Sequence, residues 1–240
     1  MSQTATDFDL AQIKQTYDRD GYVIVPGLYD NAEMLRWKQV IQKTLLDSDI
    51  DVADSGVHVW RVSNFPDGLL ESMREKNVAA ILKQIIGPSV EFLSAKAVFK
   101  NGVTKFPTPW HQDWYYWHGA PKLSVWIALD DATPANGCLK LIPGSYKKAM
   151  PNTLLQETKF ANQIDDEHLK GMPVETIDCK RGDAVFFSDL AVHSSHPNTS
   201  GEDRWSFIST YRDAAAKDEA NVWDQSLIVS GESVHENAVS

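Results

Sequence analysis

The chain has 240 residues, 42% of them hydrophobic and 23% charged, a composition that is typical of globular proteins and excludes a disordered or fibrous one. Its formal net charge of −10 argues against a nucleic acid or an anionic membrane as the partner, because either would be repelled. A chain of this length can build one sizeable core, so we expect a single domain over residues 1–240.

The first 90 residues carry mainly helical patterns. In DNAEMLRWKQVIQKTLLD, residues 30–47, Asp30 is placed as an N-cap with Glu33 three residues later, and apolar residues recur at helical spacing. A strand-like run, GYVIVPG, precedes this helix. A further helix runs through REKNVAAILKQIIGP, where Gly87 and Pro88 supply the stop.

After residue 90 the pattern changes to short strands separated by turn residues. The strand-like runs are VEFLSAKAVFK, LSVWIALDD, GCLKLIP, VETID, GDAVFF and RWSFISTYR. These runs indicate an antiparallel barrel or sandwich over residues 91–214. Since no linker separates them from the N-terminal helices, we expect the helices to pack on one face of the barrel. Residues 215–240 are expected to form a lid or a tail.

Two further features bear on the location of the protein. No apolar run approaches the roughly 20 residues that cross a bilayer, and the start, MSQTATDFDLAQ, lacks the basic and then apolar pattern of a signal peptide. Cys138 and Cys179 are too few for a disulfide framework, which predicts two small buried thiols. We therefore expect a cytoplasmic protein.

A candidate metal site begins in TPWHQDW. His111 and Asp113 are two residues apart, and such residues on a strand point to the same side, so both side chains can reach one metal ion. A third ligand is available downstream, as His193 or His196. Two histidines and one carboxylate, with three positions left open, favour a non-haem Fe(II) oxygenase. The alternative is that these are ordinary buried or surface histidines.

Arg204 lies eleven residues after His193, beyond the turn residues NTSGED. Hairpin pairing would place the arginine's strand alongside the histidine's strand. A guanidinium inside a barrel needs an anionic partner, and a dicarboxylate bound to the metal at one end would supply that partner at the other. The alternative is a surface arginine paired with Asp203 or Glu202.

Several segments together resemble the phytanoyl-CoA dioxygenase family of Fe(II)- and 2-oxoglutarate-dependent oxygenases, in an order and spacing that are highly specific. The resemblance runs from about residue 14 to 212 and is carried by DGYVIVPG, WHQDW, VWIALDDATPANGCLKLIPGSYK, GDAVFF, HSSHPN and Arg204. It implies a mainly β fold with flanking helices, in which a double-stranded β-helix, or jelly-roll, barrel of the cupin type holds iron at its mouth.

The resemblance also implies roles for individual residues. His111 and Asp113 match the HxD pair of iron ligands and His193 matches the distal histidine, which leaves His196 without a ligand role. Arg204 matches the arginine that binds the distal carboxylate of 2-oxoglutarate.

Three further residues match the cosubstrate-binding positions of the family less specifically. Ser195 resembles a hydroxyl that assists the arginine, and Trp126 corresponds to an aromatic residue that lines the cosubstrate pocket. Lys100 is a weaker match. The alternatives are a core tryptophan for Trp126 and an exposed lysine for Lys100.

The stretch TPWHQDWYYWHG concentrates aromatic side chains around the candidate ligands. An oxidising metal site should be dry and should hold one substrate C–H bond close. We expect about half of the aromatic residues to line a pocket for an apolar or planar substrate and the others to belong to the core; they are Trp110, Trp114, Tyr115, Tyr116 and Trp117. His118 is either a hydrogen-bond partner of the substrate or an exposed loop residue.

The implied activity is that of a dioxygenase that uses Fe(II), 2-oxoglutarate and O₂, oxidises a small organic molecule, by default through hydroxylation, and releases succinate and CO₂. Desaturation, ring closure and epoxidation use the same ligands. Two other functions stay open: a cupin-like metal enzyme that needs no 2-oxoglutarate, and a jelly-roll binding module without catalysis. The sequence leaves the substrate and the oligomeric state undetermined.

Overall fold

The computed structural model describes residues 8–50, 56–104, 106–154, 161–220 and 222–240. Its longer helices in these ranges are α1 (Leu10–Asp20), α2 (Asn31–Asp47) and α4 (Lys76–Ile85). Within the same ranges, no helix combines the length and the apolar character needed to cross a bilayer.

Helix α2 begins as the sequence predicts. The Asp30 carboxylate accepts a hydrogen bond from the backbone N–H of Glu33 at 2.8 Å, which satisfies one of the unpaired donors at the start of the helix. The predicted apolar stripe is buried and consists of Met34, Trp37, Ile41 and Leu45. Helix α4 ends at Ile85, just before the predicted stop.

The strands of the described residues form two main sheets and one small ribbon. The larger sheet has the order β1 (Tyr22–Val25), β10 (Ala184–Ser188), β5 (Lys122–Ala128), β12 (Arg204–Asp213), β3 (Val90–Lys100), β13 (Ser226–Ser230) and β14 (Ala238–Val239), and β2 (Val57–Arg61) also pairs with β3. The smaller sheet has the order β4 (Thr108–His111), β11 (His193–Ser195), β6 (Leu139–Leu141) and β9 (Glu175–Ile177). The ribbon pairs β7 (Thr153–Leu154) with β8 (Asn162–Gln163).

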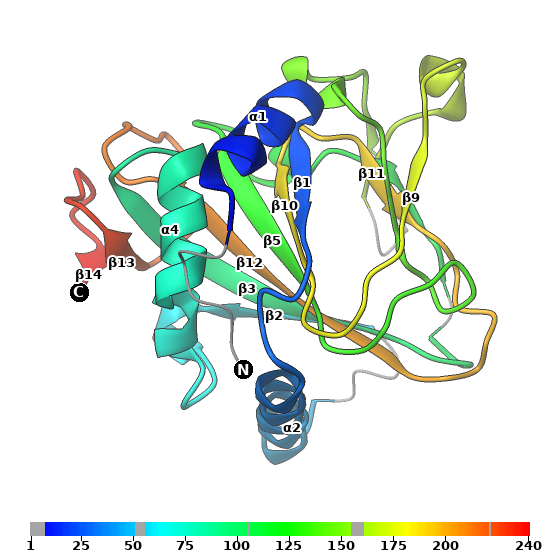
Figure 1. The fold of residues 1–240 in the computed structure, drawn as a ribbon, viewed down its shortest axis with the longest axis horizontal. Helices are drawn as coiled ribbons and strands as arrows, with labels where there is room; N and C mark the ends of the chain where they lie inside the picture. Colours follow the sequence, from blue (N-terminus) through cyan, green and yellow to red (C-terminus); the bar gives the residue numbers. More distant parts are fainter. Residues whose placement is uncertain (1–7, 51–55, 105, 155–160, 221) are drawn as a thin grey trace.

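The two main sheets are the two halves of a jelly-roll, and they are not closed into the barrel that the sequence suggested. Side chains from both sheets share one apolar cluster, which includes Trp126 and Ile208 of the larger sheet and Leu141 of the smaller. Figure 1 shows α2 and α4 on one side of the larger sheet, and β9 and β11 of the smaller sheet on the other side. The expectation that the helices cover one face is therefore confirmed.

Alternation along the strands of the larger sheet separates its two faces. In β12, Phe207 and Tyr211 belong to the apolar cluster that also contains Trp37 of α2, whereas Arg204 and Ile208 line a cavity between the sheets. Successive side chains of a strand point to opposite faces. The helix-covered face is thus the main core, and the face toward the smaller sheet is free to carry polar chemistry.

Strand β12 does not form a hairpin with β11, so the predicted pairing of their strands is wrong. Strand β11 pairs with β4 and β6 in the smaller sheet, and β12 pairs with β3 and β5 in the larger. The connection after His193 crosses from one sheet to the other, which places Arg204 opposite Lys100. His193 and Arg204 consequently belong to facing sheets and line the same cavity between them.

The C-terminal segment, residues 215–240, packs against the larger sheet. Its strand β13 pairs with β3, and the buried Asp218 carboxylate lies 2.8 Å from the Lys122 ammonium and 3.1 Å from the Arg212 guanidinium. The ring of Trp223 lies 5.5 Å, between centroids, from that of Trp117. The division of one domain into a helical region, a β core and a C-terminal segment stays a prediction.

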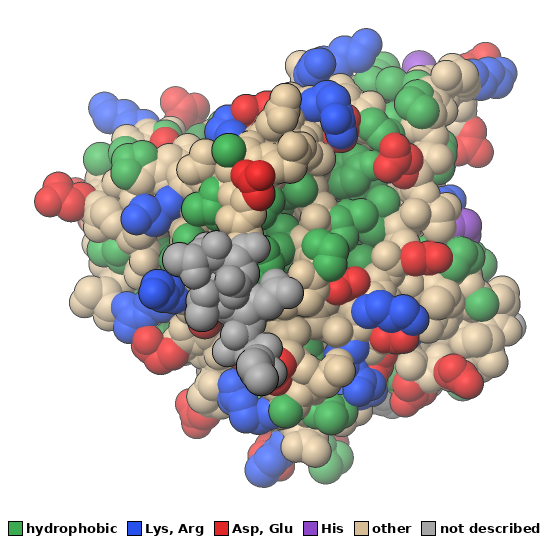
Figure 2. Space-filling model, in the orientation of Figure 1, with side chains coloured by type: hydrophobic (Ala, Val, Ile, Leu, Met, Phe, Trp, Pro, Cys, Tyr) green, Lys and Arg blue, Asp and Glu red, His purple; other side chains and the backbone are tan. Residues whose placement is uncertain are grey.

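Charged side chains of both signs are scattered over the face shown in Figure 2, with hydrophobic side chains gathered in its middle.

Phe207→Ala should lower the free energy of unfolding by about 3–5 kcal/mol, because it removes a fully buried ring and leaves a cavity. The Phe207 ring contacts Trp37 at 5.7 Å and Phe65 at 6.2 Å between centroids. Urea unfolding followed by circular dichroism would measure the change. Leu46→Ala, at an exposed position of α2, is the control and should shift the midpoint little. Equal effects of the two changes would contradict the assignment of this core.

Candidate active site

The structure brings His111, Asp113 and His193 together. His111 is the last residue of β4, and it lies directly opposite His193 of the paired strand β11. The imidazole centroids are 4.0 Å apart, and an Asp113 carboxylate oxygen lies 3.4 Å from His111 Nε2 and 3.9 Å from His193 Nε2. One ligand atom of each residue lies within 4.8 Å of the others. This spacing suits three ligands of one metal ion.

The backbone around His111 and Asp113 agrees with the predicted strand-like spacing of the two ligands, although Asp113 lies just beyond the strand. Strand β4 ends at His111, and Asp113 is the first residue of a 3₁₀ turn, η4 (Asp113–Tyr116). Between them, Gln112 keeps extended dihedral angles (φ −119°, ψ 129°), so the two side chains point to the same side, as they would along a strand.

Backbone carbonyls orient both imidazoles. His111 Nδ1 lies 2.9 Å from the carbonyl oxygen of Pro109, and His193 Nδ1 lies 2.9 Å from that of Ala191. A carbonyl can only accept, so we assign the proton of each ring to Nδ1. The Nε2 lone pairs are then free and face Asp113. Metal-binding histidines are held by the same arrangement, in which the second ring nitrogen donates to an oxygen.

The Asp113 carboxylate is fully buried, and neither of its oxygens has a hydrogen-bond donor at bonding geometry among the described residues. Burial alone would raise the pKa of this group, but the Lys96 ammonium, 3.6 Å away, and the two imidazoles lower it well below its usual value. Burial and then the neighbouring His111 lower the pKa of His193 to about 3. A buried anion faced by the Nε2 atoms of two imidazoles fits a divalent cation, and these residues suit iron.

His196 lies outside this group. Its backbone N–H donates to the carbonyl of Cys138 at 3.0 Å, and its own carbonyl accepts from the Lys100 ammonium at 2.6 Å. Because β11 extends only to Ser195, His196 follows the strand and is not part of the cluster around Asp113.

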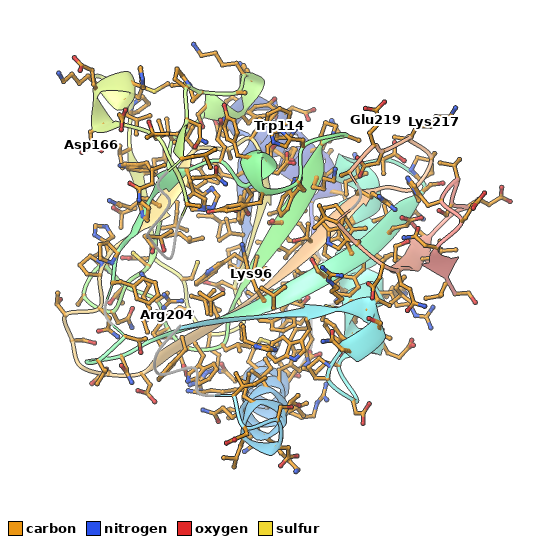
Figure 3. All side chains as sticks on the ribbon, turned by 180° about the vertical axis from the view of Figure 1, so that it is seen from behind. Lys96, Trp114, Asp166, Arg204, Lys217 and Glu219 are labelled. Atoms are coloured by element: carbon orange, nitrogen blue, oxygen red, sulfur yellow. The ribbon has the colours of Figure 1, made fainter. Side chains whose placement is uncertain are left out.

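A cavity of about 90 Å³ lies between the sheets next to the histidines. It is lined by His111 and His193, and also by Trp126, Ser195 and Arg204. The two predicted histidine ligands and three of the predicted cosubstrate-binding residues therefore share one space. Figure 3 shows Arg204 and Lys96 on neighbouring strands, with Trp114 well away from both.

Arg204 is a buried cation without a countercharge. Its side chain donates from one terminal nitrogen to Ser206 Oγ at 2.7 Å and from the other to the carbonyl of Gly137 at 3.0 Å, while Nε has no acceptor. Among the described residues, no carboxylate lies within 4.0 Å of the guanidinium. Burial lowers the pKa of Arg204 to about 10, so the group stays charged at neutral pH. The alternative of a surface ion pair is wrong, since the residue is only 2% exposed.

Lys100 and Ser195 form a hydrogen-bonded pair next to Arg204. The Lys100 ammonium donates to Ser195 Oγ at 2.7 Å, and Ser195 Oγ donates to Thr108 Oγ1 at 2.8 Å. Lys100 is fully buried, so the alternative of an exposed lysine is wrong. Its side chain does not line the cavity, and burial together with the charge of Arg204 lowers its pKa to about 7.

Trp126 lies in β5 with its ring facing the cavity between the sheets. The Arg204 guanidinium carbon is 5.9 Å from the centroid of this ring, within the range of a cation–π contact. The residue also belongs to the apolar cluster between the sheets, so it serves the core and the cavity wall together.

A second cavity, of about 490 Å³, adjoins the first and shares Val57, Lys96 and His111 with it. Of the aromatic residues of TPWHQDWYYWHG, Tyr116 and Trp117 line this cavity. The Tyr115 hydroxyl instead donates to the backbone carbonyl of Met150, and the Trp114 indole N–H donates to that of Gly119 at the end of the same stretch. The expectation that only part of the aromatic cluster lines a pocket is consistent with these positions.

Lys96 is a site residue that the sequence reasoning missed. It lies four residues before Lys100 in β3, so both side chains point to the same face of the strand. The strand pattern VEFLSAKAVFK contains this signal, because the apolar residues alternate with Ser94, Lys96 and Lys100. A polar face on a central strand of the sheet indicates a site and not a core.

Comparison with known proteins agrees with the fold and the site. Residues 17–206 match the model of the phytanoyl-CoA dioxygenase (PhyH) family. The ectoine dioxygenase of Stutzerimonas stutzeri (strain A1501) is 27% identical over 229 residues, which cover 84% of this chain and 76% of the relative. The L-proline trans-4-hydroxylase of Streptomyces griseoviridis is 26% identical over 231 residues, which cover 84% and 86%.

A solved structure shows the same fold. The crystal structure of the epimerase SnoN in complex with Fe3+, alpha ketoglutarate and nogalamycin RO has a TM-score of 0.70 at 24% identity, covering 85% of this chain and 84% of SnoN. The family model covers most of the chain, including both candidate histidines and Arg204. The chain therefore belongs to the phytanoyl-CoA dioxygenase family of Fe(II)- and 2-oxoglutarate-dependent oxygenases.

Proposed function

We propose that this chain binds Fe(II) through His111, Asp113 and His193, binds 2-oxoglutarate in the adjoining cavity through Arg204, and hydroxylates a small organic molecule. The observation that carries the proposal is the buried guanidinium of Arg204, which has no carboxylate within 4.0 Å among the described residues and lines the same cavity as the two histidines. A dicarboxylate that reached the metal with one end would give the guanidinium its countercharge at the other.

The residues around Arg204 have supporting roles in this proposal. Ser206 Oγ and the Gly137 carbonyl hold two of its nitrogens in place, so the guanidinium is fixed before the cosubstrate arrives. Trp126 lies against the guanidinium and walls the cavity. Ser195 lines the cavity, and hydrogen bonds to Lys100 and Thr108 hold its hydroxyl in place.

When bound, Fe(II) would couple the activation of O₂ and the decarboxylation of 2-oxoglutarate to oxidation of the substrate. The protein supplies orientation and the exclusion of water.

The cavity of about 490 Å³ is the proposed substrate site, because Asp113 and His111 form part of its wall and because its volume suits a small molecule. Tyr116 and Trp117 offer an aromatic surface there, which suits an apolar or ring-bearing part of the substrate. The curated relatives named above act on small molecules.

Succinate release that requires both Fe(II) and 2-oxoglutarate tests this function. We expect purified protein to form succinate with a library of small metabolites, and to stop when a chelator removes the iron and resume when Fe(II) is restored. Activity on a substrate that needs metal but no 2-oxoglutarate would support the cupin-like enzyme instead. Binding of metal with no turnover of 2-oxoglutarate under any condition would support the binding module.

A further inference from the structure

Lys96 is the starting point for an inference about the substrate. Its side chain is 28% exposed, and the ammonium lies 3.6 Å from an oxygen of Asp113. The residue lines both cavities. It therefore places a positive charge at the junction of the proposed cosubstrate and substrate sites, directly beside the proposed iron ligands.

The charges at this junction do not balance when iron and cosubstrate are bound as proposed above. Fe(II) brings two positive charges, and Lys96 and Arg204 bring one each. The 2-oxoglutarate dianion brings two negative charges, and the Asp113 carboxylate brings one. One positive charge remains. Among the described residues, no other carboxylate lies within 4.0 Å of either cation, and Lys100, when charged, adds to the excess.

An excess cation in a partly dry site is stabilised by one more anion. The bound metal would neutralise the Asp113 carboxylate. Lys96 is then the cation that has no remaining anionic partner among the described residues. The adjoining cavity of about 490 Å³ is open to this ammonium, and its other walls are mostly apolar or aromatic, including Val59, Ala95 and Trp117. The missing anion therefore belongs to the molecule that fills this cavity.

We propose, on the basis of the function proposed above, that the substrate carries a carboxylate that pairs with Lys96, while its remaining part packs against Tyr116 and Trp117. This arrangement fixes which carbon is oxidised. Because Lys96 lies beside Asp113, a carboxylate held by the ammonium places the carbons nearest to it close to the iron. The hydroxyl group is thus introduced close to the carboxylate and not at the far end of the molecule.

Paired acids and amides test this proposal by binding alone. The full chain would be loaded with Fe(II) and 2-oxoglutarate without O₂, and calorimetry would measure the dissociation constants of cyclohexanecarboxylate, indole-3-acetate and L-proline and of the primary amide of each. At least one acid should bind about tenfold or more tightly than its amide, because it forms a charge-assisted pair. A panel in which every amide binds as well as its acid would overturn the proposal.

Variants of Lys96 separate substrate binding from a merely structural role. Lys96→Met should remove the preference for the acid, and Lys96→Arg should keep part of it. Lys43→Met, which removes an exposed lysine of α2, is the control and should leave the preference unchanged. If Lys96 only held Asp113 in place, Lys96→Met would weaken acid and amide equally, and that result also contradicts the proposal. Should Lys96→Met fail to retain iron, the wild-type comparison of acid with amide still decides.

Failure of the proposed function and failure of the proposed role of Lys96 give different results in this experiment. If the Fe(II)-loaded wild-type protein does not bind 2-oxoglutarate in the same calorimeter, the cosubstrate site is wrong. If it binds 2-oxoglutarate and then shows no preference for acids, only the role of Lys96 is wrong.

Discussion

His193→Ala is expected to abolish iron-dependent turnover, whereas His196→Ala should keep most of it. Loss of a group that merely orients a ligand typically weakens metal affinity by about 10–100-fold, so loss of a ligand itself should cost more. His193 Nε2 faces the Asp113 carboxylate at 3.9 Å, while His196 follows the strand and lies outside the cluster. Equilibrium dialysis against Fe(II), together with succinate release, would measure both effects.

The pair of variants is a matched test, because the two histidines are three residues apart: His193 begins β11 and His196 directly follows its last residue. Circular dichroism would show whether each variant keeps the fold. A folded His196→Ala protein without iron, beside a His193→Ala protein that binds it, would overturn the proposed ligand set. Equal losses in both would place the metal elsewhere.

Arg204→Ala should raise the concentration of 2-oxoglutarate needed for half-maximal turnover by about 30-fold or more. Breaking one side of a charge-assisted contact in a partly dry pocket costs about 2–5 kcal/mol, and about 1.4 kcal/mol is tenfold. Affinity for iron should hardly change, because the three proposed ligands are untouched. The measurement is a titration of succinate formation with 2-oxoglutarate.

Two further variants sharpen this prediction. Arg204→Lys should recover only part of the loss, since lysine keeps the charge but not the planar fork of donors. Arg36→Ala, at an exposed position of α2, should leave the titration unchanged. In addition, 2-oxoglutarate should raise the melting temperature of the Fe(II)-loaded wild type more than that of Arg204→Ala. An unchanged titration in Arg204→Ala would mean that another residue anchors the cosubstrate.

The elements with strong local signals could be predicted from the sequence. The cap residue Asp30 and the stripe of α2 are confirmed, and so is the run VEFLSAKAVFK, which is β3 residue for residue. In both cases the period of the apolar residues matches the element and its buried face. The family assignment is confirmed as well, because it depended on the order and spacing of several segments and not on one motif.

Pairing between distant strands could not be predicted in this way. The proximity of His193 and Arg204 was foreseen, but it arises because β11 and β12 belong to facing sheets, and not from a hairpin. The spacing of residues along the chain does not indicate which sheet a strand joins, because sheet membership depends on the packing of the whole core. Lys96 was overlooked for a similar reason, because its significance depends on Asp113 of another element.

The C-terminal segment supports one wall of the larger cavity and can therefore influence which substrates related enzymes accept. The family model ends at residue 206, yet Trp223, beyond that limit, packs against Trp117 of the proposed substrate cavity. Asp218 in the same segment accepts a hydrogen bond from the backbone N–H of Ala120, in the loop that follows η4. One wall of the cavity is thus supported by a part of the chain outside the shared family region. Changes in this segment can reshape the pocket while the strands that carry the proposed iron ligands stay as they are, so substitutions here are expected to change substrate preference without changing metal binding.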